Sequence, residues 1–116
     1  GGLTGKLSGR VGDSAVIGAG TWADDATCAV SGTGHGEAFL RCALAHEIDA
    51  LLRHLGLPLD AACAAALARV AEIGSAGGCI AIGRDGDPVL RFQTAAMARG
   101  WIGAIGRARV AIFEGE

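Results

Sequence analysis

Three common features are absent from this sequence of 116 residues. No apolar run approaches about 18 residues, so we expect no transmembrane helix and no membrane partner. Basic residues are not in excess, because 10 Lys and Arg stand against 12 Asp and Glu, and we therefore expect no nucleic-acid partner. Charged residues amount to only 19%, against 51% hydrophobic residues, which favours one domain with its own core over a disordered chain.

Cysteines are present, but they lack any metal-binding pattern. There is no Cys-x-x-Cys pair and no His/Cys cluster at zinc spacing. We therefore predict no metal site in this chain and four reduced, buried thiols in a cytoplasmic protein, with a disulfide framework as the alternative. The four are Cys28, Cys42, Cys63 and Cys79.

Glycine is the residue in excess, with 20 of 116 positions, against a typical ~7% of residues. Residues 1–36 hold ten glycines, residues 37–73 hold one, and residues 74–116 hold nine. A collagen-like G-X-Y period is missing. The distribution predicts tight turns and close backbone approaches on both sides of a helical middle.

The middle of the chain predicts two helices. Apolar residues recur at helical spacing over residues 36–55, and Gly56 follows as a natural helix C-terminal residue. A second, alanine-rich helix is expected over residues 59–73, with Asp60 in its first turn.

The flanks predict strands. Residues 79–83 and 89–92 enclose an Asp85-Gly86 turn, which is a strong hairpin signal, and residues 109–113 predict a final strand. Residues 14–20 and 26–32 predict two more strands around an Asp24-Asp25 turn. The order β-β-α-α-β-β-β favours an α+β fold, with an antiparallel sheet covered by helices.

Two glycine-rich segments are candidates for a site: residues 9–14 (GRVGDS) and residues 31–37 (SGTGHGE). Glycines before a helix free backbone N–H groups to bind an anion or an oxyanion. Plain tight turns are the alternative. The second segment also lacks the third glycine of a dinucleotide-binding fingerprint. Arg10 and Asp13 form either a local ion pair or a grip on the carboxylate and the ammonium of an amino acid.

Three histidines allow a further interpretation. His46 and His54 lie about two turns apart on the first predicted helix and could share a face, but no third ligand is evident. His35 lies in the second glycine-rich segment and could line a site, but it has no evident serine or cysteine nucleophile partner in the sequence. We expect surface or boundary positions for all three.

Taken in order, the motifs resemble a known family. Residues 9–14 (GRVGDS), 17–24 (IGAGTWAD) and 33–37 (TGHGE) resemble the β-subunit of plant-type L-asparaginases, also called isoaspartyl peptidases. These are N-terminal-nucleophile (Ntn) hydrolases. The resemblance continues through residues 77–82 (GGCIAI) to residues 97–101 (MARGW), so it covers nearly the whole chain.

The resemblance implies an αββα sandwich, of which residues 1–116 are a β-subunit portion of one Ntn-hydrolase domain. It implies a precursor that cuts itself into α- and β-subunits, and an αβ unit that pairs with a second αβ unit. A small-molecule substrate is expected. No cofactor is expected in this chain, although the family often binds sodium through a loop of the α-subunit.

The resemblance also implies roles for individual residues. Arg10 is expected to bind the substrate α-carboxylate, and Asp13 the α-ammonium group. The Thr33 hydroxyl and the Gly34 backbone N–H are expected to form the oxyanion hole, and the backbone of Gly36 to contact the polar end of the substrate. The nucleophile is an N-terminal threonine whose own α-amine serves as the base.

The sequence departs from the family in one important respect. The nucleophilic threonine and a second functional threonine belong before the point that matches Gly1, so we expect them outside this chain, and Thr4 is no substitute. Ala15 stands where the family usually has proline. Asp13 favours substrates with a free α-amino group, namely L-asparagine and β-aspartyl dipeptides.

Three functions therefore stand as hypotheses. The first is hydrolysis of these substrates to L-aspartate, with the nucleophile supplied from outside the chain. The alternative is a non-catalytic fragment or pseudoenzyme that binds an amino acid through Arg10 and Asp13. A purely structural domain is the third, and it predicts that a change of Arg10 alters stability and leaves ligand binding unchanged.

Overall fold

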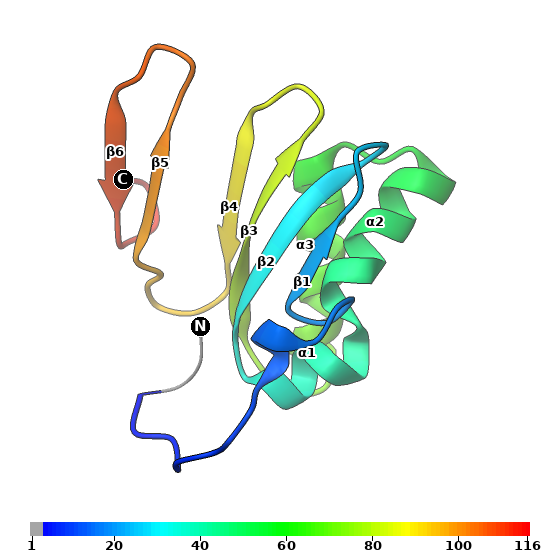
Figure 1. The fold of residues 1–116 in the computed structure, drawn as a ribbon, viewed down its shortest axis with the longest axis vertical. Coiled ribbons are helices and arrows are strands. Elements are labelled where there is room, and N and C mark those ends of the chain that lie inside the picture. Colours follow the sequence, from blue (N-terminus) through cyan, green and yellow to red (C-terminus); the bar gives the residue numbers. More distant parts are fainter. Residues whose placement is uncertain (1–3) are drawn as a thin grey trace.

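The computed structural model describes residues 4–116. Its centre is an antiparallel sheet in the order β1-β2-β3-β4, and a two-stranded antiparallel hairpin, β5-β6, stands to one side of it (Figure 1). The strands are β1 (Thr21–Ala23), β2 (Cys28–Gly34), β3 (Gly77–Gly83), β4 (Pro88–Phe92), β5 (Arg99–Ile102) and β6 (Ala108–Ala111). The helices are the short 3-10 helix η1 (Asp13–Ala15), α1 (Gly36–Cys42), α2 (Leu44–Leu55) and α3 (Leu59–Glu72).

The three α-helices lie against one face of the sheet, which we call the covered face (Figure 1). The opposite face, the uncovered face, has no layer over it among residues 4–116. The prediction of an α+β fold with an antiparallel sheet under helices is confirmed. Among the same residues, no helix has both the length and the apolar character needed to cross a membrane.

The single helix predicted over residues 36–55 is wrong, because the chain breaks at Ala43. This residue adopts a left-handed conformation, with φ 46° and ψ 50°, between α1 and α2. Such a conformation costs roughly 1–2 kcal/mol for a residue with a Cβ. Two backbone N–H groups of α2 offset that cost by donating outside the helix, from Ala45 to Ala19 O (3.0 Å) and from His46 to Gly18 O (2.9 Å). Contacts distant in the sequence therefore decide where α2 begins.

The strand predicted over residues 14–20 is also wrong. Residues of this segment form η1 and a tight turn, and β1 begins only at Thr21. The carbonyl oxygen of Asp13 accepts hydrogen bonds from the N–H groups of Val16 (2.9 Å) and Gly20 (3.2 Å), which coils the segment around Asp13. Gly18, with φ +92°, supplies a turn that other residues rarely adopt.

The other elements agree more closely with the sequence. The strand expected over residues 26–32 is β2, shifted by two residues, and the second predicted helix is α3, which begins after the left-handed C-terminal Gly56 of α2. The hairpin around Asp85-Gly86 joins β3 to β4, with φ +84° at Gly86. Of the last hairpin, only β6 was predicted. Its partner β5 was missed because residues 99–102 (RGWI) lack a clear alternating pattern.

Side chains alternate in β3 as the pleat of a strand requires. Cys79 and Ala81 face the helices and are buried, while Ile80 and Ile82 lie on the uncovered face. The prediction of four free, buried cysteines is confirmed. The buried cluster between sheet and helices contains Cys28, Val30, Ala38, Phe39, Cys42, Leu44, Ala45, Ile48, Ala62, Cys63, Ala66, Leu67, Val70, Cys79 and Ala81.

Two polar contacts tie helices to the sheet. Buried Asp49 on α2 accepts hydrogen bonds from Thr27 Oγ1 and from Arg53 Nε at 3.3 Å, and Arg53 Nη2 also pairs with Asp24 at 2.8 Å. Burial alone would raise the pKa of Asp49, but the hydrogen bonds from Thr27 and Arg53 outweigh it and hold that pKa below its usual value. On α3, Asp60 accepts two hydrogen bonds from the guanidinium of Arg91, at 2.6 and 2.7 Å.

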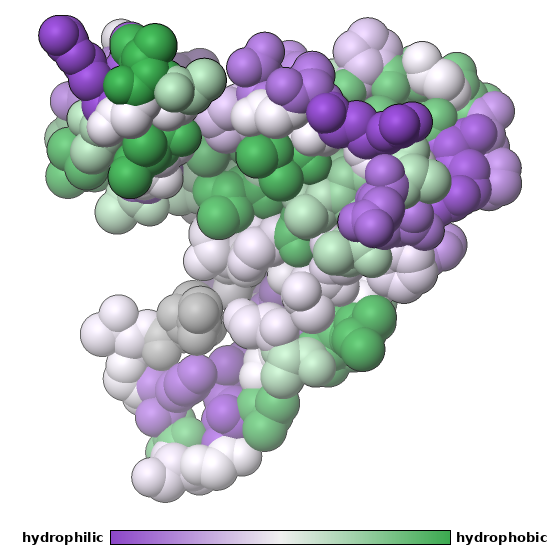
Figure 2. Space-filling view, turned by 45° about the horizontal axis from the view of Figure 1, so that its top comes forward, coloured by the Kyte–Doolittle hydropathy of each residue, from purple (hydrophilic) through white to green (hydrophobic). Residues whose placement is uncertain are grey.

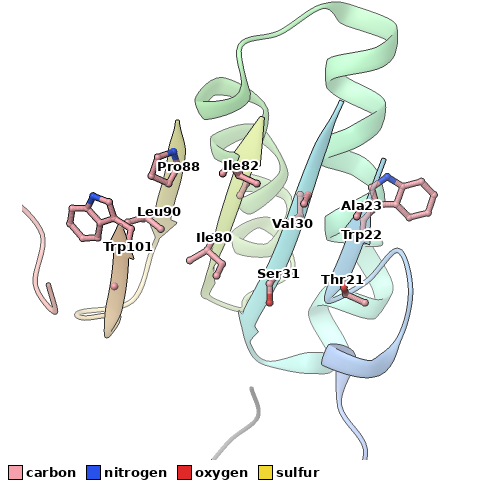
Figure 3. A pocket seen from close by; sticks show the side chains of 13 residues that line it. Thr21, Trp22, Ala23, Val30, Ser31, Ile80, Ile82, Pro88, Leu90 and Trp101 are labelled. Carbon is pink, nitrogen blue, oxygen red and sulfur yellow. The ribbon is translucent and has the colours of Figure 1, made fainter. Parts of the chain in front are cut away.

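The uncovered face carries an apolar pocket of about 330 Å³ between the sheet and β5. Figure 3 shows Ile80 and Leu90 on one side of it and Trp101 on the other, whereas the ring of Trp22 is turned away from them. Trp22 instead meets the ring of His46 on α2 edge to face, with centroids 5.0 Å apart. In the space-filling view, apolar side chains reach the surface on the hairpin and on the body beside it (Figure 2).

Candidate functional site

Asp13, at the start of η1, is the buried charged residue of the candidate site. Only 3% of its surface is exposed, and its side chain lies between two glycines, Gly20 and Gly36. A Cβ at Gly20 would lie 2.5 Å from Asp13 O and Oδ2, and one at Gly36 would lie 2.8 Å from Oδ1. Both positions therefore require glycine so that the carboxylate can occupy this place.

One oxygen of the Asp13 carboxylate has no partner. Oδ2 is buried and accepts no hydrogen bond from any residue of the described chain. A buried ionised carboxylate without a partner is costly, by several kcal/mol. Since such an oxygen accepts hydrogen bonds only, a cationic donor such as an ammonium group is the ligand that would satisfy it.

Thr33 and Gly34 end strand β2 and lie opposite Gly78 and Gly77 of β3. Gly34 has φ +144°, and a Cβ there would lie 2.7 Å from the Cα of Gly77, so only glycine fits without strain. The pleat of β2 places the Thr33 side chain, which is exposed, on the uncovered face. Together with Met97 these residues line a concavity of about 340 Å³.

Phe39 of α1 supports the end of β2 from the covered side. Its ring is fully buried and lies where a Cβ at Gly32 or Gly77 would stand, 2.8 and 2.6 Å from ring carbons. A Cβ at Gly34 would also touch the ring, at 3.4 Å. Three glycines thus form a flat seat for one aromatic ring, which fixes the strand end that carries Thr33.

Arg10 occupies a different place. Its side chain is exposed and lines a concavity of about 300 Å³ together with His35, Gly36, Arg41 and Ser75. No ion pair joins Arg10 to Asp13 anywhere in residues 4–116, so the local ion pair considered from the sequence is not formed. Sequence reasoning gave no function to Arg41 or Ser75, because neither belongs to a glycine-rich motif.

The structure therefore brings some predicted site residues together and leaves others apart. Asp13 and Gly36 are in direct contact, and Gly36 also borders the concavity of Arg10. Thr33 and Gly34 line a separate concavity, which contains neither Arg10 nor Asp13. The substrate roles expected for these residues remain predictions.

The histidines lie at the surface, as the sequence suggested. His35 Nδ1 is 2.9 Å from Ser75 Oγ, which links the segment before α1 to the segment after α3. His46 and His54 are both exposed on α2. In the described part of the chain, no group of three or more His, Cys, Asp or Glu side chains is placed so that it could hold a metal ion.

Comparison with known proteins gives consistent matches. The sequence model of the asparaginase family matches residues 1–112. The chain is 46% identical over 102 residues to the isoaspartyl peptidase of Escherichia coli (strain K12), which covers 87% of this chain and 32% of that protein. It is 41% identical over 114 residues to the probable isoaspartyl peptidase/L-asparaginase 2 of Arabidopsis thaliana, covering 98% of this chain and 34% of that protein.

A mammalian relative matches in the same way. The chain is 42% identical over 100 residues to the isoaspartyl peptidase/L-asparaginase of Rattus norvegicus, covering 84% of this chain and 29% of that protein. This chain thus spans about a third of the length of the curated relatives that it matches.

Proposed function

Because this chain belongs to the asparaginase family, we propose that it forms the substrate-binding part of an amidohydrolase. The enzyme would hydrolyse the side-chain amide of L-asparagine and the isopeptide bond of β-aspartyl dipeptides, and it would release L-aspartate. The names of the relatives, isoaspartyl peptidase and L-asparaginase, support this substrate class. Their greater length supports a nucleophile that is supplied outside this chain.

The observation that carries the proposal is the carboxylate of Asp13. It is buried between two glycines and keeps one oxygen without a partner. The α-ammonium group of L-asparagine would supply both the missing charge and the missing donor. A substrate that lacks this group would leave the buried carboxylate unpaired, which is how Asp13 would select amino acids.

The proposed reaction follows the usual path of acyl transfer. The hydroxyl of an N-terminal threonine attacks the side-chain carbonyl carbon, and the α-amine of that threonine takes the proton. The developing oxyanion accepts hydrogen bonds from the Thr33 hydroxyl and the Gly34 N–H. The protonated α-amine gives its proton to the leaving nitrogen, and ammonia or an amino acid departs. Water then cleaves the acyl-enzyme, which releases L-aspartate and restores the threonine hydroxyl. Arg10 would bind the α-carboxylate.

The same proposal accounts for the uncovered face. We propose that an α-subunit and the remaining strands of the β-subunit cover Ile80 and Ile82, which completes an αββα sandwich from this portion, residues 1–116. A second αβ unit would then pair with the first. The exposed apolar side chains of the face and hairpin support a covering layer. Four unpaired thiols support a cytoplasmic location.

The proposal is tested by enzyme kinetics, with L-asparagine and a β-aspartyl dipeptide as substrates. The sample is the complete protein, which means this chain together with the part that would carry the N-terminal threonine. Asp13→Asn and Arg10→Ala should each raise KM strongly, because each removes one charged contact to the substrate. Thr33→Ala should instead lower kcat by about 100- to 1,000-fold. Asp25→Asn, which changes an exposed carboxylate of the β1–β2 turn, is the matched control and should alter neither constant. An unchanged KM in Arg10→Ala would contradict the proposal.

A non-catalytic amino-acid binder is the second candidate. It is favoured by one observation, that Thr33 and Gly34 lie in a concavity apart from Arg10 and Asp13. Calorimetric titration of L-aspartate into the complete protein, combined with an assay of ammonia release from L-asparagine, distinguishes the two candidates. A binder without a nucleophile would bind L-aspartate, lose that binding in Asp13→Asn, and release no ammonia from L-asparagine.

A further inference from the structure

The concavity that Arg10 lines contains more positive charge than a single substrate contact needs. Arg10 and Arg41 both border it, and neither forms an ion pair or a side-chain hydrogen bond with any residue in the range 4–116. Glu37 supplies the one carboxylate on the wall. The two guanidinium groups and this carboxylate together give the wall one net positive charge.

The polar wall is held in place from two elements. His35 immediately precedes α1, Ser75 follows α3, and His35 Nδ1 lies 2.9 Å from Ser75 Oγ. Arg41 projects from the last turn of α1, so the three side chains come from separate points around the concavity. Its volume of about 300 Å³ is at the lower end of the ~300–1,000 Å³ typical of small-molecule sites.

We propose that this concavity is a binding site for a small inorganic oxyanion, held mainly by the guanidinium groups of Arg10 and Arg41. Guanidinium groups bind oxyanions through paired N–H donors, which lysine cannot do in the same geometry. The small net charge and the presence of Glu37 favour a single compact anion over a polyanion. Binding of the anion at this site does not depend on the proposed enzymatic function.

The site has a consequence that rests on the proposed function. The Arg10 guanidinium that would hold the anion is the same group that the proposed function assigns to the substrate α-carboxylate. A bound oxyanion therefore competes with the substrate for Arg10, although it does not occupy the concavity of Thr33 and Gly34. The anion therefore raises KM and leaves kcat unchanged.

Binding is tested first, with inorganic phosphate as the probe. Calorimetric titration of phosphate into the complete protein, at ionic strength matched with sodium chloride, should give one site. Arg41→Gln should weaken the affinity at least about tenfold, because it removes a charged hydrogen-bond donor. Arg107→Gln, in the β5–β6 turn and outside the lining of the concavity, is the matched control and should bind as the unaltered protein does.

Competition is tested second, by measuring KM for L-asparagine with and without phosphate. KM with phosphate, divided by KM without phosphate, should exceed one in the unaltered protein and in Arg107→Gln. The same ratio should fall to about one in Arg41→Gln. Equal phosphate affinity in Arg41→Gln and Arg107→Gln would overturn the site. Binding without any effect on KM would overturn the competition. A protein that binds phosphate but hydrolyses nothing would instead contradict the proposed function and leave the site intact.

Discussion

Both faces of the four-stranded sheet carry apolar side chains, yet the two faces lie in different environments. On the covered face, Cys79 and Ala81 of β3 are 0% and 5% exposed. On the uncovered face, Ile80 and Ile82 of the same strand are larger and more apolar, yet they are 47% and 44% exposed. Apolar character therefore does not decide burial within this chain. The layer that packs over each face decides it.

The site residues divide in the same way. Asp13 and Phe39 belong to the covered side, where glycines fit tightly around them. Thr33 lies on the uncovered face, and Arg10 lies at the surface. The covered side of the molecule thus positions a buried charge, while the groups expected to meet the reacting amide face open space.

Among the substitutions that test this difference between the two faces, we expect the largest loss of stability from one on the covered face. Phe39→Ala should lower the free energy of unfolding by about 3–5 kcal/mol, because it removes a fully buried ring. The three glycines that contact the ring, Gly32, Gly34 and Gly77, have no side chains that could fill the space left by it. Urea unfolding measures the change. Ile82→Ala is the control on the uncovered face, and a loss there as large as in Phe39→Ala would show that the faces do not differ.

A smaller effect is expected from the polar contact between α2 and the β1–β2 turn. Asp49→Asn should lower the free energy of unfolding by about 1–3 kcal/mol at pH 7, because hydrogen bonds from Thr27 and Arg53 to a charged group are weakened. The lowered pKa of Asp49 means that its ionised form stabilises the folded state. That contribution is fully present above the unfolded pKa of about 3.9 and disappears as the pH falls through the lower folded value.

Urea unfolding at pH 7 and at successively lower pH tests this expectation. The difference in stability between the unaltered protein and Asp49→Asn should be largest at pH 7 and should shrink as acid protonates Asp49. Asp25→Asn, an exposed carboxylate, should show no such difference. A gap between Asp49→Asn and the unaltered protein that widened in acid would contradict the sign of the shift.

The smallest effect is expected on the uncovered face. In the chain by itself, Ile80→Ser should change the free energy of unfolding by no more than about 1 kcal/mol, because the side chain is already 47% exposed. In the complete protein, the same change should be several times more destabilising if other strands cover this face. Thermal unfolding of both forms measures the contrast. Equal, small effects in both would remove the support for a covering layer.

Much of the fold could be predicted from local pattern. The alanine-rich helix, the Asp85-Gly86 hairpin and the burial of the four cysteines follow from propensity, turn chemistry and polarity, which act over a few residues. The site could be predicted only as a set of residues. Their arrangement could not, because nothing in the spacing of Arg10 and Asp13 indicates that one is exposed and the other buried.

The sequence by itself indicated the family and most of the element types, although it missed β5. Only the tertiary structure decided that residues 36–55 break at Ala43 and that residues 14–20 coil around Asp13. The break at Ala43 goes with hydrogen bonds between residues distant along the chain, from Ala45 and His46 to Ala19 and Gly18. The coil goes with bonds from Val16 and Gly20 to the carbonyl oxygen of Asp13. Local patterns report the preference of a segment in isolation. A hydrogen bond to a backbone group elsewhere in the fold can outweigh that preference, because alternative local conformations differ only slightly in free energy.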